Sequence, residues 1–201
     1  MRGMHKVIFL PGAAGAAAFW RPVGGLLPAA WEKAYLAWPG LGAEAPDPAV
    51  QGFDDLVRLV EAELTDDSSL VAQSMGGIPA VRVASRHPEQ VRRLVLVATS
   101  GGVDVARFGG ADWRDGYKAE HPTAASWVTD ERPDHTDDMR AVAAPTLLIW
   151  GDSDPISPVA VGEHLASLLP DARLHVVAGG THSLAVDRAR ETARLIAEHV
   201  A

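Results

Sequence analysis

Apolar and polar positions along the chain follow two alternating patterns. Short runs rich in Val, Ile and Leu, typical of buried strands, are separated by longer stretches with helical spacing. From these runs we predict six strands, over His5–Leu10, Lys33–Trp38, Ser68–Gln73, Arg93–Thr99, Pro145–Trp150 and Arg173–Val177. The fourth run is apolar without interruption from Leu94 to Ala98, which is typical of a strand covered on both faces.

The stretches between these strands predict helices. One apolar stripe at helical spacing consists of Phe53, Leu56, Val57, Val60 and Leu64. Further helices are predicted over Ile78–Arg86 and Val159–Leu169, and a last one would bury Ala185, Ala189, Ala193, Ile196 and Val200. Because strands alternate with helices, we predict an α/β fold with a mostly parallel sheet of about six strands and helices on both faces.

The regular pattern is lost between residues 100 and 144. This stretch is rich in Gly, Asp, Arg and His, yet it also carries Phe108, Trp113, Tyr117 and Trp127, more aromatic surface than a solvated loop needs. We find no internal repeat and no interdomain linker. We therefore interpret residues 1–201 as a single domain in which residues 100–144 form a short cap-like insertion after the fourth strand.

Composition and charge narrow the class of protein. The chain is 47% hydrophobic and 22% charged, as ordinary globular proteins are, and it has no run of about 20 apolar residues that could span a membrane. A net charge of -8 without a basic stripe argues against a nucleic-acid partner. The absence of cysteine excludes disulfides, thiolate metal sites and a cysteine nucleophile.

The N-terminal stretch superficially resembles a secretory signal, since basic residues precede an apolar run and a series of alanines. Pro11 and Gly12 end that run after four residues, Val7 to Leu10. The loop that follows this run is also expected to be part of the folded domain, so its removal as a signal peptide would damage the fold. We therefore expect a cytoplasmic location.

The third predicted strand runs directly into the sequence Ala72-Gln73-Ser74-Met75-Gly76. This sequence is close to G-x-S-x-G, the nucleophile elbow, in which a tight strand-to-helix turn lifts a serine hydroxyl above the sheet. Ala72 stands where the pattern has its first glycine, and Gly76 stands at the second. Taken alone, the pattern also fits the alternative that Ser74 caps a helix.

Two further turns fall on the same edge of the predicted sheet. The fifth strand leads into Gly151-Asp152-Ser153-Asp154, and the sixth is followed by Gly179-Gly180-Thr181-His182. In such sheets ligands bind outside the carboxyl ends of the strands. Ser74, an aspartate of the first turn and His182 would meet there in the chain order Ser, Asp, His, which is the order of α/β-hydrolases. For His182 an ordinary solvated role is the alternative.

With these motifs in this order, the chain resembles the α/β-hydrolase superfamily over nearly all its length, and in particular its small esterases and lipases with a reduced cap. The resemblance implies that Asp154 is the acid, because the family places it three residues after the strand-ending glycine. Asp152 is the alternative. The resemblance also implies that the N-terminal hairpin of larger relatives is absent.

The expected chemistry assigns a role to each of these residues. His182 would remove the proton of the Ser74 hydroxyl, and Asp154 would orient the imidazole and stabilise its charged form. The backbone N–H groups of Met75 and Ala13 would form the oxyanion hole. Many relatives have His-Gly where this chain has Pro11-Gly12, so the support of the Ala13 loop differs here.

A serine nucleophile favours a serine hydrolase, and we expect a carboxylesterase that acts on small or medium apolar acyl esters through an acyl-enzyme. Aromatic side chains near the oxyanion loop and in the insertion are predicted to line the substrate pocket, with core packing as the alternative. These residues are Phe19, Trp20, Trp113, Tyr117 and Trp127.

Other functions use the same residues. Thioester hydrolysis, carbon–carbon bond hydrolysis and hydroxynitrile cleavage share this triad, and a binding module for small molecules could retain it without catalysis. Residues 134–138 carry ligand-type side chains but have no second cluster and no HExxH spacing, so we predict no metal. Residues 12–15 lack a nucleotide-binding glycine pattern, so we expect no cofactor. The sequence leaves the oligomeric state open.

Overall fold

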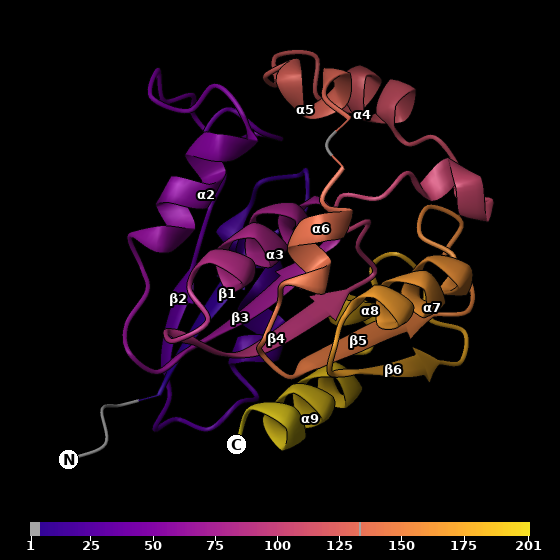
Figure 1. Cartoon of the computed structure of the whole chain (residues 1–201). Coiled ribbons are helices and arrows are strands. Elements are labelled where there is room, and N and C mark those ends of the chain that lie inside the picture. Colours follow the sequence, from indigo (N-terminus) through magenta and orange to yellow (C-terminus); the bar gives the residue numbers. More distant parts are fainter. Residues whose placement is uncertain (1–4, 133) are drawn as a thin grey trace.

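The structure, a computed structural model, describes residues 5–132 and 134–201 (Figure 1). Its strands are β1 (Lys6–Leu10), β2 (Glu32–Tyr35), β3 (Ser68–Gln73), β4 (Val91–Val97), β5 (Thr146–Gly151) and β6 (Ala172–Val177). They form one parallel sheet in the order β2-β1-β3-β4-β5-β6. The prediction of a parallel six-stranded sheet is therefore confirmed.

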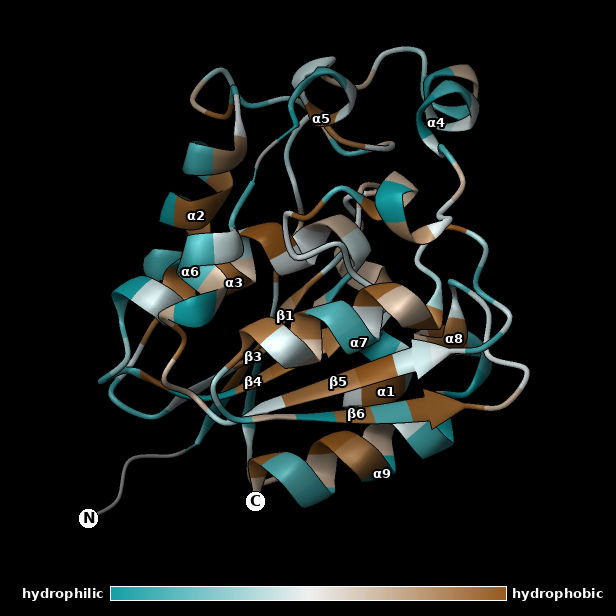
Figure 2. Ribbon diagram, turned by 45° about the vertical axis from the view of Figure 1, so that its right-hand side comes forward, coloured by the Kyte–Doolittle hydropathy of each residue, from teal (hydrophilic) through white to brown (hydrophobic). Residues whose placement is uncertain are grey.

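Helices cover both faces of this sheet. The α-helices are α1 (Arg21–Gly24), α2 (Phe53–Glu61), α3 (Gly77–Arg86), α4 (Arg114–Glu120), α5 (Trp127–Asp130), α6 (Thr136–Arg140), α7 (Val159–Leu168), α8 (Leu184–Asp187) and α9 (Ala189–Val200). Short 3-10 helices are η1 (Ala17–Trp20), η2 (Ser74–Gly76) and η3 (Val105–Phe108). Helices α2, α3, α6 and α7 lie on one face, and α1, α8 and α9 lie on the other (Figures 1 and 2).

The strands supply both core layers because their side chains alternate between the faces. In β1, Ile8 and Leu10 belong to the core cluster that packs under α2, α3 and α7, whereas Val7 and Phe9 belong to the cluster under α9. Figure 2 shows the resulting apolar strands between helices with apolar inner surfaces. A strand that is buried on both faces can be apolar at every position, as β4 is from Leu94 to Val97.

The second predicted strand ends earlier than expected. The pattern predicts Lys33–Trp38, but β2 ends at Tyr35. Trp38 turns away from the strand direction because its backbone N–H donates to the Gly15 carbonyl at 2.9 Å and its indole N–H donates to the Pro11 carbonyl at 2.7 Å. The fully buried Trp38 thus supports the loop that follows β1 instead of extending the sheet.

Most other strands and helices differ from the predicted ranges by one to three residues, and two elements differ for a clear backbone reason. The strand predicted over Arg93–Thr99 is displaced to Val91–Val97, because Ala98 has a φ of 47° and leaves the extended conformation. The predicted C-terminal helix is broken at Arg188, whose φ of −119° and ψ of 37° separate α8 from α9. Ala185 is nevertheless buried as expected, at the start of this region.

Residues 100–144 contain short helices that the sequence pattern did not predict. Helix α6 packs on the sheet face through the buried Met139, whereas α4 and α5 lie beyond the end of the sheet (Figure 1). The link to the rest of the fold includes Trp127, which packs edge-on against Phe53 with ring centroids 5.2 Å apart. The aromatic residues of this stretch are therefore partly used to attach it.

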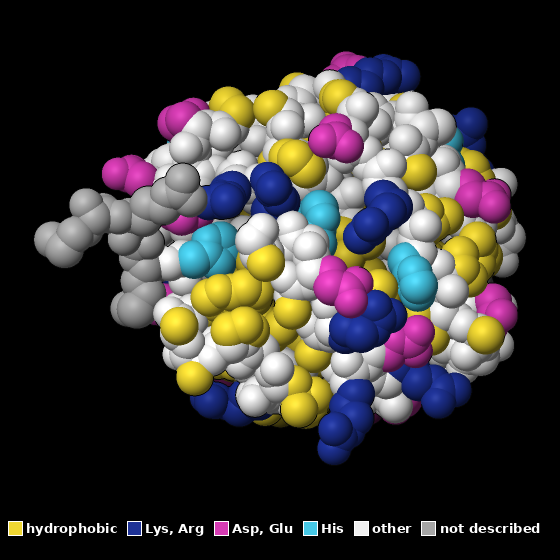
Figure 3. Space-filling view, turned by 90° about the horizontal axis from the view of Figure 1, so that it is seen from below, with side chains coloured by type: hydrophobic (Ala, Val, Ile, Leu, Met, Phe, Trp, Pro, Cys, Tyr) yellow, Lys and Arg dark blue, Asp and Glu magenta, His cyan; other side chains and the backbone are white. Residues whose placement is uncertain are grey.

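The surface carries charges of both signs. In the view of Figure 3, Lys and Arg side chains are interspersed with Asp and Glu and with apolar side chains. Among the residues that the structure describes, no helix has the length and apolar character needed to cross a membrane.

Candidate active site

The turn after β3 gives Ser74 an unusual backbone. Its φ is 52°, in the left-handed region that residues other than glycine rarely adopt. The chain turns directly from β3 into η2 and α3, and the hydroxyl of Thr99 donates to the Ser74 carbonyl. A methyl group on Gly76 would lie 2.3 Å from the Pro11 carbonyl oxygen, so only glycine fits there. The glycine at the second small position of the predicted elbow, Gly76, is thus explained by its close contact with the loop after β1.

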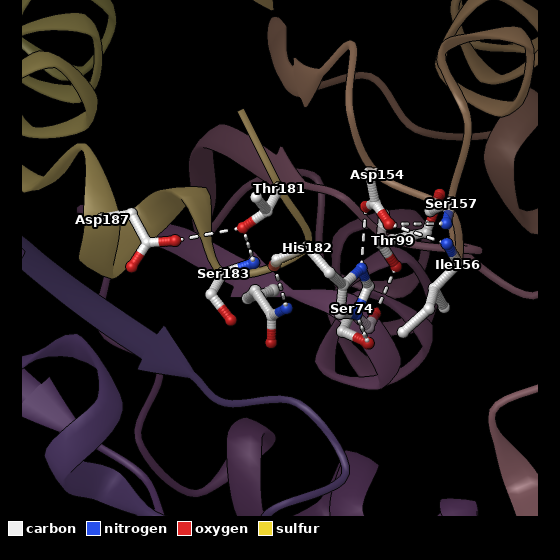
Figure 4. A network of polar contacts seen from close by, with 10 residues as sticks. Ser74, Thr99, Asp154, Ile156, Ser157, Thr181, His182, Ser183 and Asp187 are labelled. Atoms are coloured by element: carbon white, nitrogen blue, oxygen red, sulfur yellow. Dashed lines mark hydrogen bonds and ion pairs between the residues drawn. The ribbon is translucent and has the colours of Figure 1, made fainter. Parts of the chain in front are cut away.

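His182 lies between Ser74 and Asp154 (Figure 4). The distance from His182 Nε2 to Ser74 Oγ is 2.9 Å, and that from His182 Nδ1 to Asp154 Oδ2 is 2.8 Å. With an ionised Asp154, Nδ1 donates to the carboxylate and Nε2 is left to accept the serine proton. These are the contacts that nucleophilic catalysis by serine requires.

The two candidate aspartates have different partners. The Asp154 side chain is fully buried, and its Oδ1 accepts the backbone N–H groups of Ile156 at 2.8 Å and Ser157 at 3.1 Å. Asp152 accepts instead the backbone N–H of Gly179 at 2.7 Å. Asp154 therefore faces His182, while Asp152 holds the turn after β6.

Supporting contacts that sequence reasoning missed fix the position of the histidine loop. The side-chain amide of Gln73 donates to the His182 carbonyl at 3.2 Å. Thr181 donates to Asp187 at 3.0 Å and accepts the backbone N–H of Ser183 at 3.2 Å (Figure 4). The sequence could have indicated a role for Gln73, because it is an amide side chain at the end of a predicted buried strand. The turn contacts had no such signal.

The predicted oxyanion donors lie beside the serine. Met75 follows Ser74 in η2, and Ala13 follows Gly12, where an added methyl would lie 3.0 Å from Ser74 Cβ. Within the described part of the chain, the Ala13 N–H donates to no protein acceptor. A donor in this position is available to a ligand. The role of both groups stays a prediction.

A cavity of about 400 Å³ opens from Ser74, Met75 and His182 toward the insertion. This volume lies in the range of about 300–1,000 Å³ that is common for small-molecule sites. Apolar side chains from several elements line it, among them Phe53, Ile78, Val128 and Ile156. Charged groups, including Arg107, Arg114 and Glu131, also line the wall. Burial and the charge of Asp54 raise the pKa of Glu131 above its usual range.

Of the five aromatic residues predicted to line the pocket, Trp113 is found in the cavity wall, and the other four lie outside this cavity. Trp20 is fully buried and donates to the Leu10 carbonyl at 2.9 Å, and Phe19 packs edge-on against it. Trp127 packs against Phe53, and the hydroxyl of Tyr117 donates to the backbone carbonyl of Ala13. Each of these four aromatic side chains is held by core packing or by a hydrogen bond, and their predicted contact with substrate stays a prediction.

Comparison with known families agrees with this fold. A family described as "Alpha/beta hydrolase family" matches residues 7–137, and a second, described as "alpha/beta hydrolase fold", matches residues 108–189. The chain therefore belongs to the alpha/beta hydrolase family.

Individual relatives are similar over most of the chain. A pimeloyl-[acyl-carrier protein] methyl ester esterase of Neisseria meningitidis is 26% identical, over 87% of this chain and 85% of its own length. A 2-hydroxymuconate semialdehyde hydrolase of Pseudomonas putida is 25% identical, over 72% of this chain and 66% of its own. The crystal structure of the carboxylesterase CesB from Bacillus subtilis, 16% identical, covers 100% of this chain and 85% of its own with a TM-score of 0.74. The relatives are hydrolases, and the structural likeness concerns the fold.

Proposed function

We propose that this protein is a serine hydrolase, and specifically a carboxylesterase that cleaves small or medium apolar acyl esters through an acyl-enzyme. The observation that carries the proposal is the position of His182, whose two ring nitrogens lie 2.9 Å from Ser74 Oγ and 2.8 Å from Asp154 Oδ2. An esterase among the relatives supports the choice of an ester.

In the proposed reaction, His182 removes the proton of the Ser74 hydroxyl as its oxygen attacks the ester carbonyl. The carbonyl oxygen gains negative charge and accepts hydrogen bonds from the N–H groups of Met75 and Ala13. His182 then donates its proton to the departing alcohol, which leaves an acyl-enzyme on Ser74. Water, activated by the same imidazole, releases the acid and restores the serine.

The proposed acyl preference is supported by the apolar part of the cavity wall. Met75, Ile78 and Ile156 are apolar, as is Trp113 from the insertion. An apolar acyl chain would remove these side chains from water, at about 25 cal/mol per Å² of buried apolar surface. The limited volume of the cavity favours a small or medium chain. The predicted cytoplasmic location stays a prediction.

The test is hydrolysis of nitrophenyl esters of increasing acyl length by the wild type, Ser74→Ala and Ser167→Ala. We expect Ser74→Ala to lower kcat on the order of 10⁶-fold, because the nucleophile is lost. The exposed Ser167, whose hydroxyl donates to a backbone carbonyl within α7, serves as the control and should retain activity. Turnover by Ser74→Ala close to that of the control would refute the proposal.

A further inference from the structure

Tyr117 connects the insertion to the loop that follows β1. Its hydroxyl donates to the Ala13 carbonyl at 2.8 Å and accepts the backbone N–H of Gly42 at 2.9 Å. These partners lie 104 and 75 residues away in the sequence. Burial raises the pKa of the Tyr117 phenol, with the Gly42 hydrogen bond acting in the opposite direction. The hydroxyl therefore keeps its proton at neutral pH and remains a donor.

The residues around Gly42 form the other support of this loop. Gly42 has a φ of 55°, and a methyl group on it would lie 2.0 Å from the Ala14 carbonyl oxygen. Trp38 contacts both ends of the loop, because it donates to the carbonyls of Pro11 and Gly15. The loop of residues 11–15 is therefore held by Trp38 and, through Tyr117, also by the insertion.

Ala13 is held through the peptide groups on both of its sides. The peptide that carries the Ala13 N–H also carries the Gly12 carbonyl, which accepts from the Gly15 N–H at 3.0 Å. The next peptide carries the Ala13 carbonyl, which accepts from Tyr117. The planes of these two peptide groups are related only by the φ and ψ of Ala13. Because a hydrogen bond holds each plane, the Ala13 N–H can take few directions.

We propose that Tyr117 is a positioning residue whose hydroxyl fixes the Ala13 loop, so that the Ala13 N–H points to the place of the developing oxyanion. The proposal rests on the proposed function, in which Ala13 is an oxyanion donor. Trp113 extends the connection to the substrate, since it lines the cavity and packs edge-on against Tyr117 with ring centroids 5.5 Å apart. An acyl group that fills the cavity would therefore contact Trp113, the N-cap residue of the helix that carries Tyr117.

The test compares Tyr117→Phe with Tyr35→Phe. Tyr117→Phe removes the hydroxyl and keeps the ring on Trp113, so the fold should be retained. Tyr35 is the other tyrosine of the chain, and it stacks on Phe9 in the core under α9. Two quantities are measured: the kinetic constants for a nitrophenyl ester, and the amide hydrogen exchange of residues 12–15 and 42 by NMR.

We expect Tyr117→Phe to lower kcat by about 10- to 100-fold with little change in KM, because a displaced oxyanion donor affects the transition state more than the bound ester. Exchange at residues 12–15 and 42 should be faster in Tyr117→Phe only. Unchanged exchange, or faster exchange with wild-type kcat, would overturn the proposal. If the wild type hydrolyses no ester, the proposed function fails, and the exchange rates alone decide whether Tyr117 holds the loop.

Discussion

Ser74, the proposed nucleophile, has a strained backbone. A non-glycine residue with a φ of 52° is expected to cost on the order of 1–3 kcal/mol, and such strain persists only where the surroundings enforce it. Here the enforcing contacts are the Thr99 hydroxyl on the Ser74 carbonyl and the close approach of Gly76 to Pro11. The sequence indicated the turn through its small residues. Thr99 could not be identified, because its role depends on the neighbouring strand.

The two aspartates after β5 give the sharpest prediction at the residue scale. Asp154→Asn should lower kcat on the order of 10⁴-fold, because an amide cannot hold His182 in the required tautomer. Asp152→Asn should have a small effect, since its amide oxygen can still accept from the Gly179 N–H. Both variants are assayed with the same nitrophenyl ester. A larger loss of kcat in Asp152→Asn than in Asp154→Asn would show that Asp152, and not Asp154, is the acid.

At the scale of the elements, strands were easier to predict than the insertion. The strands carry apolar runs that follow from burial on both faces, whereas α4 and α5 have no continuous apolar stripe and depend on contacts with distant segments. The positions of Trp20 and Tyr117 depend on which carbonyl accepts their polar end, and no local pattern reveals that partner. The sequence predicted that these aromatics line the substrate pocket, with core packing as the alternative, and it could not locate their hydrogen-bond partners.

The crossing of β1 and α3 can be tested with two glycines. A methyl at Gly76 would collide with the Pro11 backbone, so Gly76→Ala should lower the free energy of unfolding by about 1–3 kcal/mol. Gly116 lies inside α4 with no atom within 4 Å of the added methyl, so Gly116→Ala should raise it by about 0.5–1 kcal/mol. Urea denaturation measures both changes. Equal effects of the two substitutions would show that the close approach at the elbow is not rigid.

At the scale of the whole molecule, the site depends on the parallel sheet. His182 lies 108 residues from Ser74 and 28 from Asp154 in the sequence, yet all three follow the carboxyl ends of strands at one edge. This meeting could be predicted, because every parallel strand ends at the same edge. The cavity could not, since its wall combines residues such as Phe53, Trp113 and Ile156 from separate parts of the chain.

The most direct test of the central claim, that Ser74 is a nucleophile activated by His182, is covalent labelling with a fluorophosphonate at neutral pH. Mass spectrometry of the intact protein and of its peptides locates the adduct. We predict one adduct, on Ser74 in the wild type, with none in Ser74→Ala and strongly slowed labelling in His182→Ala. A folded wild-type protein that gains no adduct on Ser74, or that labels equally fast without His182, would contradict the account.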